Sequence, residues 1–438
     1  MKNMKSILVI STIFFVIILS SCSDDSVSET PDVEPPTVES PNILFIIADD
    51  LGKDAINGFT EGSIKPNTPN IDAIRNNGLS FSNFWTYPTC SPTRASMITG
   101  KYGYRTNVKG AGDILDESEV VLQKYISDNT DNDYASAMVG KWHLSGNGLG
   151  VNPESFGIDY YAGLIRGVVA DYYDWKFSED GVSSMETSYA TEKFTDLSIN
   201  WINEQSKPWF LWLAYNAPHT PFHAPPSNMH SQGSLPTYVN GVDPIPYFMA
   251  AIEAMDYQIG RLLDNIPVDE RENAIIIFIG DNGTPSQVAQ SPYSSSTVKN
   301  TLYQGGVNAP MFISGKGVDR TGDDNNLITS SDLFSTLSEI AGVSENAIHD
   351  SKSFKSLFTS NNNSIRDYQY SEMNDGITDA WTISNGEYKL IVNSNGEEEM
   401  YKLVDDSYEN NDLLNGTLTT DEESAKAGLE AELLIIRN

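Results

Sequence analysis

Four short apolar runs, each ending abruptly in polar residues, constrain the fold of this chain most strongly. They are NILFIIADD from Asn42, YASAMVGKWH from Tyr134, PWFLWLAYNAPH from Pro208 and NAIIIFIGDNG from Asn273. Runs of this length that are rich in β-branched and apolar residues are typical of strands buried on both faces, as in parallel sheets. We therefore expect a parallel sheet at the centre of the molecule.

Helix signals lie between these runs. The stretch TPNIDAIRNNG has Thr68 as a candidate N-cap, Pro69 at the first helical position and Gly78 beyond the end. Between Phe248 and Leu262, apolar residues recur at steps of 4, 3, 4 and 3, which predicts one face of an amphipathic helix. Strands that alternate with helices predict an α/β fold, a large and mostly parallel sheet sandwiched by helices.

The sequence changes character from about residue 348. Short alternating runs, WTISNGEYKLIVN and EEEMYKLV, are separated by turn-forming Ser, Asn and Gly residues. This pattern predicts a small antiparallel sheet. We accordingly expect a catalytic domain over residues 42–347 and a C-terminal α+β subdomain over residues 348–438.

The N-terminal segment has the features of an export signal. Two lysines precede an apolar run over residues 7–19, which is too short to span a bilayer but suits a signal peptide. The sequence LSSC resembles a bacterial lipobox, so residues 1–21 are predicted to be a lipoprotein signal peptide and Cys22 to be lipidated. Residues 22–41 contain several prolines, several acidic residues and no basic residue, which predicts an extended acidic tether.

The expected location follows from this segment. We expect an exported protein that is anchored to the outer membrane through the lipid on Cys22, facing the periplasm or the cell surface. The acidic SDD that follows Cys22 resembles the export tag of surface lipoproteins in Bacteroidetes-like bacteria.

The net charge limits the possible partners. With 27 basic and 60 acidic residues the formal charge is −33. A nucleic-acid partner is not expected, because phosphate backbones are bound through an excess of Lys and Arg. An anionic substrate would have to be attracted by a local cluster of positive groups.

The strand ends carry the candidate chemistry, since ligands of open parallel sheets bind beyond the carboxyl ends of the strands. Asp49 and Asp50 follow one run, and Asp281 and Asn282 follow another. Either pair alone is also compatible with a polar turn. Three carboxylates in one crevice would repel one another by roughly 4 kcal/mol per pair, so they need a cation or must protonate. Oxygen donors suit Ca²⁺, or less well Mg²⁺, and the five histidines are poor provision for a two-zinc site.

Basic residues also stand at or near predicted strand ends. Lys141 and His143 follow one run, His219 follows another, and Lys299 precedes the glycine pair at residues 305–306. Each is compatible with a solvated surface position when it is considered alone. Placed in one crevice, they would form a positive lining around the metal that suits a tetrahedral anion.

Cys90 has no expected disulfide partner, because the only other cysteine, Cys22, is predicted to be lipidated. It is therefore a buried inert thiol or a functional one. In PTCSPTRASMITG, Ser91 as N-cap and Gly100 as terminator predict a short helix over residues 93–99. The free amides at its start attract negative charge, and Arg94 can fold back toward them. A thiolate is a poor ligand for a hard cation, so the encoded cysteine does not suit the site.

These motifs together resemble those of one family. Residues 88–100 resemble the first sulfatase signature, with Cys90 to Arg94 as its C-x-P-x-R core, and YASAMVGKWHL resembles the second, although Asp133 replaces a common Gly. ADDLG, NAPHTPFHAP, GDNG and KNTLYQGGVNAPMFISG occur in the order of the family. From about Asn42 to Asn415 the chain resembles the type I formylglycine-dependent sulfatases of the alkaline phosphatase superfamily, in a bacterial lipoprotein form.

The resemblance implies a modified residue and a metal site. A separate maturase would convert Cys90 to formylglycine (3-oxoalanine), whose hydrate supplies the attacking oxygen. The implied Ca²⁺ ligands are Asp49, Asp50, Asp281, Asn282 and an oxygen of the modified Cys90.

The resemblance also assigns roles to the remaining site residues. Arg94 would hold the hydrate, and Lys141 and Lys299 would stabilise charge on the sulfuryl oxygens. His219, with Lys299, would protonate the departing alcohol, and His143 would accept a proton as sulfate leaves. Gln304 replaces a frequent Glu of the family, which we expect to affect loop packing or a supporting hydrogen bond.

The expected activity is hydrolysis of sulfuric esters, of the EC 3.1.6 type. For an exported bacterial protein the expected substrate is a sulfated polysaccharide or oligosaccharide. Two alternatives remain open, a phosphomonoester or phosphonate hydrolase of the same superfamily and a non-catalytic glycan-binding surface lipoprotein.

Overall fold

The computed structural model describes residues 40–146, 151–361, 364–374 and 379–438. The predicted signal peptide, Cys22 and nearly all of the tether lie outside the described residues. Ser40–Asn438 forms one compact unit, so the division at residue 347 stays a prediction. In the part of the chain that the structure describes, no helix is long and apolar enough to cross a membrane.

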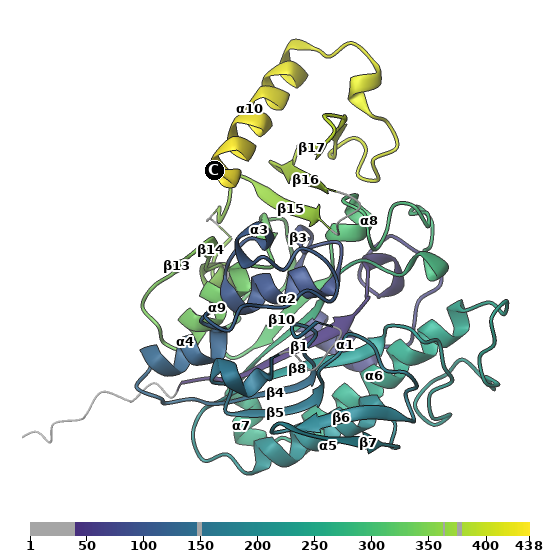
Figure 1. The fold of residues 1–438 in the computed structure, drawn as a ribbon, viewed down its shortest axis with the longest axis vertical. Helices are drawn as coiled ribbons and strands as arrows, with labels where there is room; N and C mark the ends of the chain where they lie inside the picture. Colours follow the sequence, from purple (N-terminus) through teal and green to yellow (C-terminus); the bar gives the residue numbers. More distant parts are fainter. Residues whose placement is uncertain (1–39, 147–150, 362–363, 375–378) are drawn as a thin grey trace, which may run out of the picture. The chain divides into compact units, whose positions relative to one another are not determined.

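A ten-stranded sheet forms the centre of this unit, with the order β11-β2-β10-β9-β1-β8-β4-β5-β6-β7 (Figure 1). The five strands β9, β1, β8, β4 and β5 run parallel to one another, while β10, β6 and β7 join antiparallel on the two sides. This confirms the predicted mostly parallel sheet. The strands are β1 Asn42–Asp49, β2 Gly78–Phe81, β4 Ala135–Lys141, β5 Tyr160–Leu164, β6 Trp175–Glu179, β7 Val182–Glu186, β8 Trp209–Pro218, β9 Ala274–Gly280, β10 Met311–Gly315 and β11 Gly322–Asp324.

Helices cover both faces of the sheet. Alternate residues of each central strand point to opposite sides, and because both sets are apolar, both faces need covering. In β1, Ile43, Phe45 and Ile47 pack in a core shared with α2, α4 and α9. Leu44 and Ile46 pack in a second core, shared with α1, α5 and α6. These helices are α1 Pro69–Asn76, α2 Cys90–Thr99, α4 Leu122–Asn129, α5 Ala190–Asn203, α6 Ile245–Asn265 and α9 Asp332–Ile340.

Two predicted helices are confirmed and one begins earlier than predicted. Helix α1 begins at Pro69, and α6 contains the predicted apolar face. Helix α2 begins at Cys90 with Thr89 as N-cap, three residues before the predicted start at residue 93. Ser91 does not cap the helix because its hydroxyl donates to the His143 carbonyl at 2.9 Å. The predicted terminator is correct, since Gly100 ends α2 with φ of 70°.

A four-stranded antiparallel sheet follows near the C-terminus, as predicted, in the order β15-β16-β17-β18. Helix α10 packs on β16 and β17 (Figure 1). The Gln369 side chain of β15 donates to the Ile328 carbonyl at 2.8 Å, which ties this sheet to the main body. These elements are β15 Gln369–Asn374, β16 Asp379–Ser384, β17 Tyr388–Asn393, β18 Glu398–Lys402 and α10 Thr420–Arg437.

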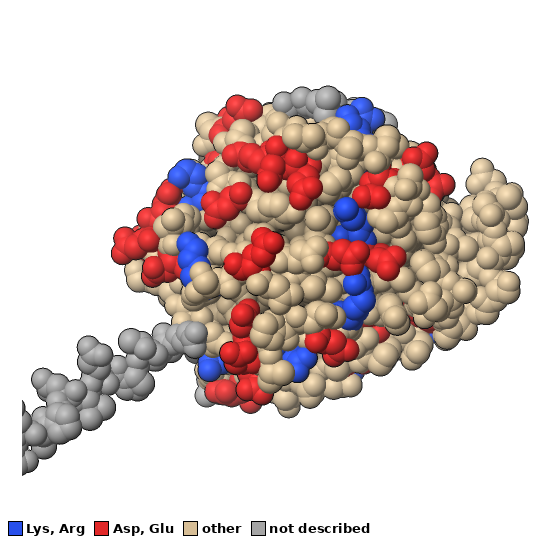
Figure 2. Space-filling view, turned by 90° about the horizontal axis from the view of Figure 1, so that it is seen from below, with Lys and Arg blue, Asp and Glu red and all other residues tan. Residues whose placement is uncertain are grey.

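The remaining elements are short. They are β3 Phe84–Trp85, β12 Ile328–Thr329, β13 Ala347–Ile348, β14 Ser351–Lys352, α3 Gly103–Thr106, α7 Val268–Glu272 and α8 Gln304–Val307. On the face drawn in Figure 2, acidic side chains are spread widely and basic ones form small groups among them.

Candidate active site

The ends of β1 and β9 bring four oxygen-bearing side chains together. The two strands are parallel neighbours with Ala48 opposite Gly280, so the residues that follow them meet at one edge. The backbone N–H of Asp50 donates to Asp281 Oδ1 at 3.0 Å. Asn282 Nδ2 donates to Asp50 Oδ1 at 2.8 Å. Asp49, Asp281 and Asn282 are fully buried, and Asp50 is 1% exposed.

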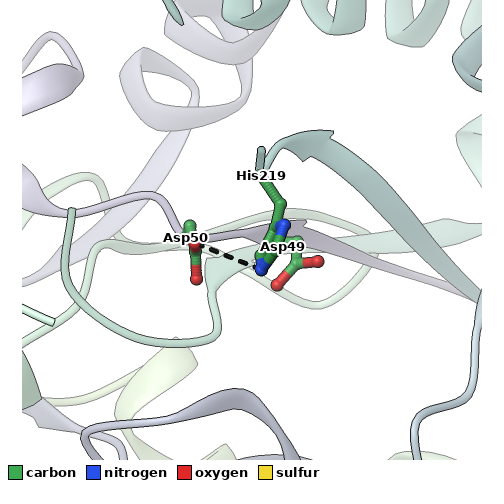
Figure 3. Close-up of side chains that lie close together, drawn as sticks. All are labelled: Asp49, Asp50 and His219. Atoms are coloured by element: carbon green, nitrogen blue, oxygen red, sulfur yellow. Dashed lines mark ion pairs between the residues drawn. The ribbon is translucent and has the colours of Figure 1, made fainter. Parts of the chain in front are cut away.

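Strands β8 and β4 bring basic groups to the same edge. Lys141 is the last residue of β4, and its Nζ donates to Asp49 Oδ2 at 2.6 Å. His219 follows β8, and its Nε2 lies 3.5 Å from Asp50 Oδ2. Figure 3 shows the imidazole of His219 reaching toward Asp50, with the Asp49 carboxylate beside it.

Lys299 reaches the site from the loop that follows β9. Its Nζ lies 2.5 Å from Asp50 Oδ1 and 2.6 Å from Oδ2. Two backbone hydrogen bonds hold the loop, from Lys299 N to Thr284 O at 3.2 Å and from Asn300 N to Pro88 O at 3.0 Å. The Lys299 loop is therefore tied both to the end of β9 and to the segment that precedes Cys90.

Helix α2 contributes Cys90 and Arg94 from its first two turns. Arg94 Nη2 donates to Asp281 Oδ2 at 2.8 Å, and Nη1 donates to the Lys141 carbonyl at 2.9 Å. Cys90 is 2% exposed, and its Sγ lies 3.1 Å from His143 Nδ1. The predicted catalytic and metal-binding residues are thus brought into one connected group.

The charges of this group shift its acids in opposite directions. Burial alone would raise the pKa of Asp50, but the charges of His219 and Lys299 outweigh it and hold the pKa well below its usual range. Burial and the nearby charge of Asp49 raise the pKa of Asp281. Carboxylates held this close need positive neighbours, and the lysines and Arg94 supply them.

The basic groups divide into charged and neutral members. Burial alone would lower the pKa of Lys141, but the Asp49 carboxylate outweighs it and raises that pKa, so the ammonium stays charged. Burial and the charge of Lys141 hold the pKa of His143 well below its usual range. His143 is accordingly neutral near pH 7 and can accept a proton.

The buried oxygens fit a divalent cation. Asp49 Oδ1 and Asn282 Oδ1 are buried without a hydrogen-bond partner, which is costly for such groups. Ligand atoms of Asp49, Asp50 and His219 all lie within 4.8 Å of one another. A hard cation that prefers oxygen ligands, such as Ca²⁺, suits these donors. His219 is a nearby group that the sequence did not predict as a ligand.

A supporting hydrogen-bond network was not predicted from the sequence. Thr284 Oγ1 donates to Asp54 Oδ1 at 2.5 Å and accepts from the N–H of Gly52 at 3.1 Å. The N–H of Gln290 donates to Asp54 Oδ2 at 2.9 Å. These bonds fasten the loop after β1 to the loop after β9. The proximity of Asp54 to Asp50 in sequence was the only available signal.

Gly167 is a second residue that the sequence did not indicate. A Cβ atom at this position would lie 2.1 Å from His143 Nε2, so only glycine allows the backbone to approach the imidazole. The preceding residues hold His143 as well, because its N–H donates to the Ile165 carbonyl at 3.1 Å. Gly167 stands in a loop without a recognisable motif.

The fold and this site define a class of proteins, the ester hydrolases of the alkaline phosphatase superfamily. The model of the sulfatase family matches residues 41–343. The chain belongs to the sulfatase family, as a type I sulfatase, and hydrolyses sulfuric esters.

Individual relatives agree with this family. The chain is 25% identical over 417 residues to an arylsulfatase of Klebsiella aerogenes, covering 70% of this chain and 88% of that protein. It is 31% identical over 206 residues to an N-acetylglucosamine-6-O-sulfatase of Bacteroides thetaiotaomicron, which covers 46% of this chain and 33% of that longer protein. A crystal structure of Ps i-CgsB in complex with k-i-k-neocarrahexaose superimposes with a TM-score of 0.73 and 25% identity, covering 88% and 91% of the two chains.

Proposed function

We propose that this protein is an exported sulfatase that removes sulfate from a sulfated polysaccharide or oligosaccharide, using a formylglycine made from Cys90 and one Ca²⁺ ion. The observation that carries the proposal is the surroundings of Cys90. Cys90 is 2% exposed at the start of α2, its Sγ lies 3.1 Å from His143 Nδ1, and the Arg94 guanidinium lies one turn further along the helix, bonded to Asp281. A thiol is a poor ligand for the hard cation expected here, whereas a hydrated aldehyde offers two hydroxyl groups that can bind the cation and exchange a proton with His143.

Formylglycine and the cation, when present, would supply a nucleophilic oxygen and charge stabilisation at the sulfate. The residues of the chain provide the rest. Two hydrogen bonds, to Asp281 and to the Lys141 carbonyl, orient Arg94 one helical turn from residue 90. His143 presents Nδ1 to residue 90, where it would accept a proton when sulfate is released.

Two lysines would stabilise the charge of the sulfate, and one histidine would protonate the leaving group. The Nζ atoms of Lys141 and Lys299 lie on Asp49 and Asp50 at 2.6 and 2.5 Å, at the point where a bound sulfate would need positive charge. His219 Nε2 points toward Asp50, beside Lys299, where it would donate a proton to the departing alcohol. The proposed metal ligands are Asp49, Asp50, Asp281 and Asn282, together with residue 90.

Two observations support a glycan as the substrate, the similar proteins and the predicted export signal. Similar proteins include one solved in complex with k-i-k-neocarrahexaose and one named as an N-acetylglucosamine-6-O-sulfatase. The predicted signal peptide, the predicted lipidation of Cys22 and the predicted acidic tether favour a location outside the cytoplasm, where such polymers are encountered. A maturase that modifies Cys90 would act on the chain first.

Mass spectrometry tests the modification directly. The peptide that contains residue 90 should be lighter by about 18 Da than the encoded sequence after co-expression with a maturase. Hydrolysis of 4-nitrophenyl sulfate should greatly exceed hydrolysis of 4-nitrophenyl phosphate by the same preparation. A preference for the phosphate would favour the phosphoester alternative, and an unmodified but fully active Cys90 would contradict the proposed mechanism.

A further inference from the structure

A small cavity is lined by residues of the segment 164–168, which also contacts His143, and none of its lining residues belongs to the group described above. Its volume is about 110 Å³, and it lies at the carboxyl end of β5. A cavity needs roughly 10–15 Å³ of this measure to hold one water molecule, so there is room for a group of several heavy atoms. Its walls include Leu164, Ile165, Arg166, Val168, Lys176 and Ser178.

The cavity is attached to the catalytic edge by backbone contacts. The N–H of Trp142 donates to the Leu164 carbonyl at 3.0 Å, and the N–H of His143 donates to the Ile165 carbonyl at 3.1 Å. Gly167 lies against the imidazole of His143. Arg166 and Val168, on either side of Gly167, therefore line a space that shares this loop with the catalytic edge.

Two cations in this cavity have no anionic partner. Neither the Arg166 nor the Lys176 side chain forms an ion pair or hydrogen bond with another described residue. Lys176 stands opposite Met185 in the β6–β7 pair, and Ser178 stands opposite Ser183, so these side chains share one face of the two strands. In a chain with a net charge of −33, two unpaired cations at one place are a specific attraction for an anion.

The other walls are apolar and partly open. Val168 is 49% exposed, and Met185 is 63% exposed on the strand face that carries Lys176. Apolar surface with a few convergent polar groups is typical of small-molecule sites. Such walls suit the C–H face of a sugar ring, and guanidinium and ammonium groups bind sulfate or carboxylate through charge-assisted hydrogen bonds.

We propose that this cavity binds the sulfate or carboxylate, and part of the ring, of a sugar unit next to the one from which sulfate is removed. The proposal rests on the proposed function, because it extends the same substrate beyond the scissile group. It makes the substrate an oligosaccharide with at least two anionic groups. Arg166 and Lys176 hold the second anion, and the apolar walls hold the ring.

Binding to the inactive Cys90→Ala protein tests this proposal without consuming the ligand. The probes are tetrasaccharides of ι-carrageenan, chondroitin 6-sulfate and heparin, measured by calorimetry at low and high salt. For at least one probe, adding Arg166→Gln and Lys176→Gln should raise Kd roughly tenfold or more, and the salt dependence should become shallower. Adding Lys316→Gln is the matched control, since Lys316 is an exposed lysine just beyond β10, in the opposite half of the sheet, and should leave Kd unchanged.

The two proposals fail in different ways. Absence of 4-nitrophenyl sulfate hydrolysis by the matured wild-type protein would overturn the proposed function. Equal Kd values with and without the double substitution, or no binding of any probe, would overturn the cavity proposal alone. It would also be overturned if the double substitution lowered aryl sulfate turnover as much as oligosaccharide binding, because that pattern indicates a displaced His143.

Discussion

Sγ of Cys90, in the buried first turn of helix α2, lies 3.1 Å from Nδ1 of His143. The side chain of residue 90 is therefore within hydrogen-bonding distance of the imidazole. A group made from this cysteine would have the imidazole within hydrogen-bonding distance as a proton acceptor.

We expect Cys90→Ala to abolish turnover, and Cys90→Ser to do the same when it is produced with a maturase that acts on cysteine. Loss of an attacking group typically lowers kcat by roughly a thousandfold or more. The measurement is initial-rate hydrolysis of 4-nitrophenyl sulfate, with thermal unfolding to show that both variants fold. Retained activity of Cys90→Ala would contradict the assigned nucleophile.

Gly167→Ala should slow the reaction by displacing His143. The added Cβ would lie 2.1 Å from His143 Nε2, so the imidazole or the loop must move. Misplacement of a catalytic group by about 1 Å can cost roughly a hundredfold, and we expect the loss mainly in kcat. Gly428→Ala is the matched control, because a Cβ there meets no atom within 4 Å. Equal rates for Gly167→Ala and wild type would show that His143 does not depend on this contact.

Calcium should stabilise the protein through the buried oxygens of Asp49 and Asn282, which lack partners. A ligand at 100 times its Kd stabilises the folded state by about 2.7 kcal/mol, which thermal unfolding detects as a rise in Tm. Asp49→Asn or Asn282→Ala should reduce this rise, whereas the exposed Asp319→Asn should not. A Tm that does not respond to Ca²⁺ after treatment with EDTA would argue against a calcium site.

The buried pair Lys389–Glu409 should be important for stability. Its Nζ–Oε1 distance is 2.5 Å and the two side chains are 0% and 1% exposed. Glu409 also accepts from the N–H of Gln304 at 2.5 Å, and Lys389 donates to the Leu302 carbonyl at 2.6 Å. The pair therefore joins the C-terminal sheet to the segment that follows Lys299. Gln304 lies within this segment, and its Oε1 accepts from Asn308 Nδ2 at 2.8 Å.

Lys389→Met should lower the free energy of unfolding by about 3–5 kcal/mol, because it leaves a buried carboxylate unpaired. Adding Glu409→Gln should restore part of the loss. Chemical denaturation gives both values. The exposed pair Lys402–Asp405 is the control, and Lys402→Met should leave the denaturation midpoint nearly unchanged. Equal effects of the two lysine substitutions would contradict the importance of burial.

Stability should decrease in mild acid because of His223. Burial lowers the pKa of His223 from 6.5 to about 4, and its ring is stacked on Tyr172 with centroids 3.7 Å apart. Between these values the unfolded chain binds the proton and the folded chain does not, so stability falls as the pH drops from 6.5 to about 4. The full effect is up to about 3 kcal/mol. The difference between wild type and His223→Gln, measured from pH 7 to pH 4, isolates it, and parallel curves would contradict the prediction.

Local patterns in the sequence were enough to predict the central sheet and to indicate which residues gather at its carboxyl edge. Apolar runs such as that of β1 are local patterns, and a strand that is buried on both faces has to be apolar throughout. The polar residues that end these runs, Asp49, Lys141, His219 and Asp281, were found for the same reason. The carboxyl ends of neighbouring parallel strands meet at one edge, so residues far apart in sequence could be expected to lie together.

The pairing and support of these residues, in contrast, depend on contacts between distant segments. The bonds of Lys141 to Asp49 and of Lys299 to Asp50 join residues 92 and 249 positions apart. The fit of Gly167 to His143 and the cavity with Arg166 depend on how a loop without a motif packs on a strand end. No local pattern encodes such contacts, because each depends on side-chain geometry that is established only when distant segments pack against one another.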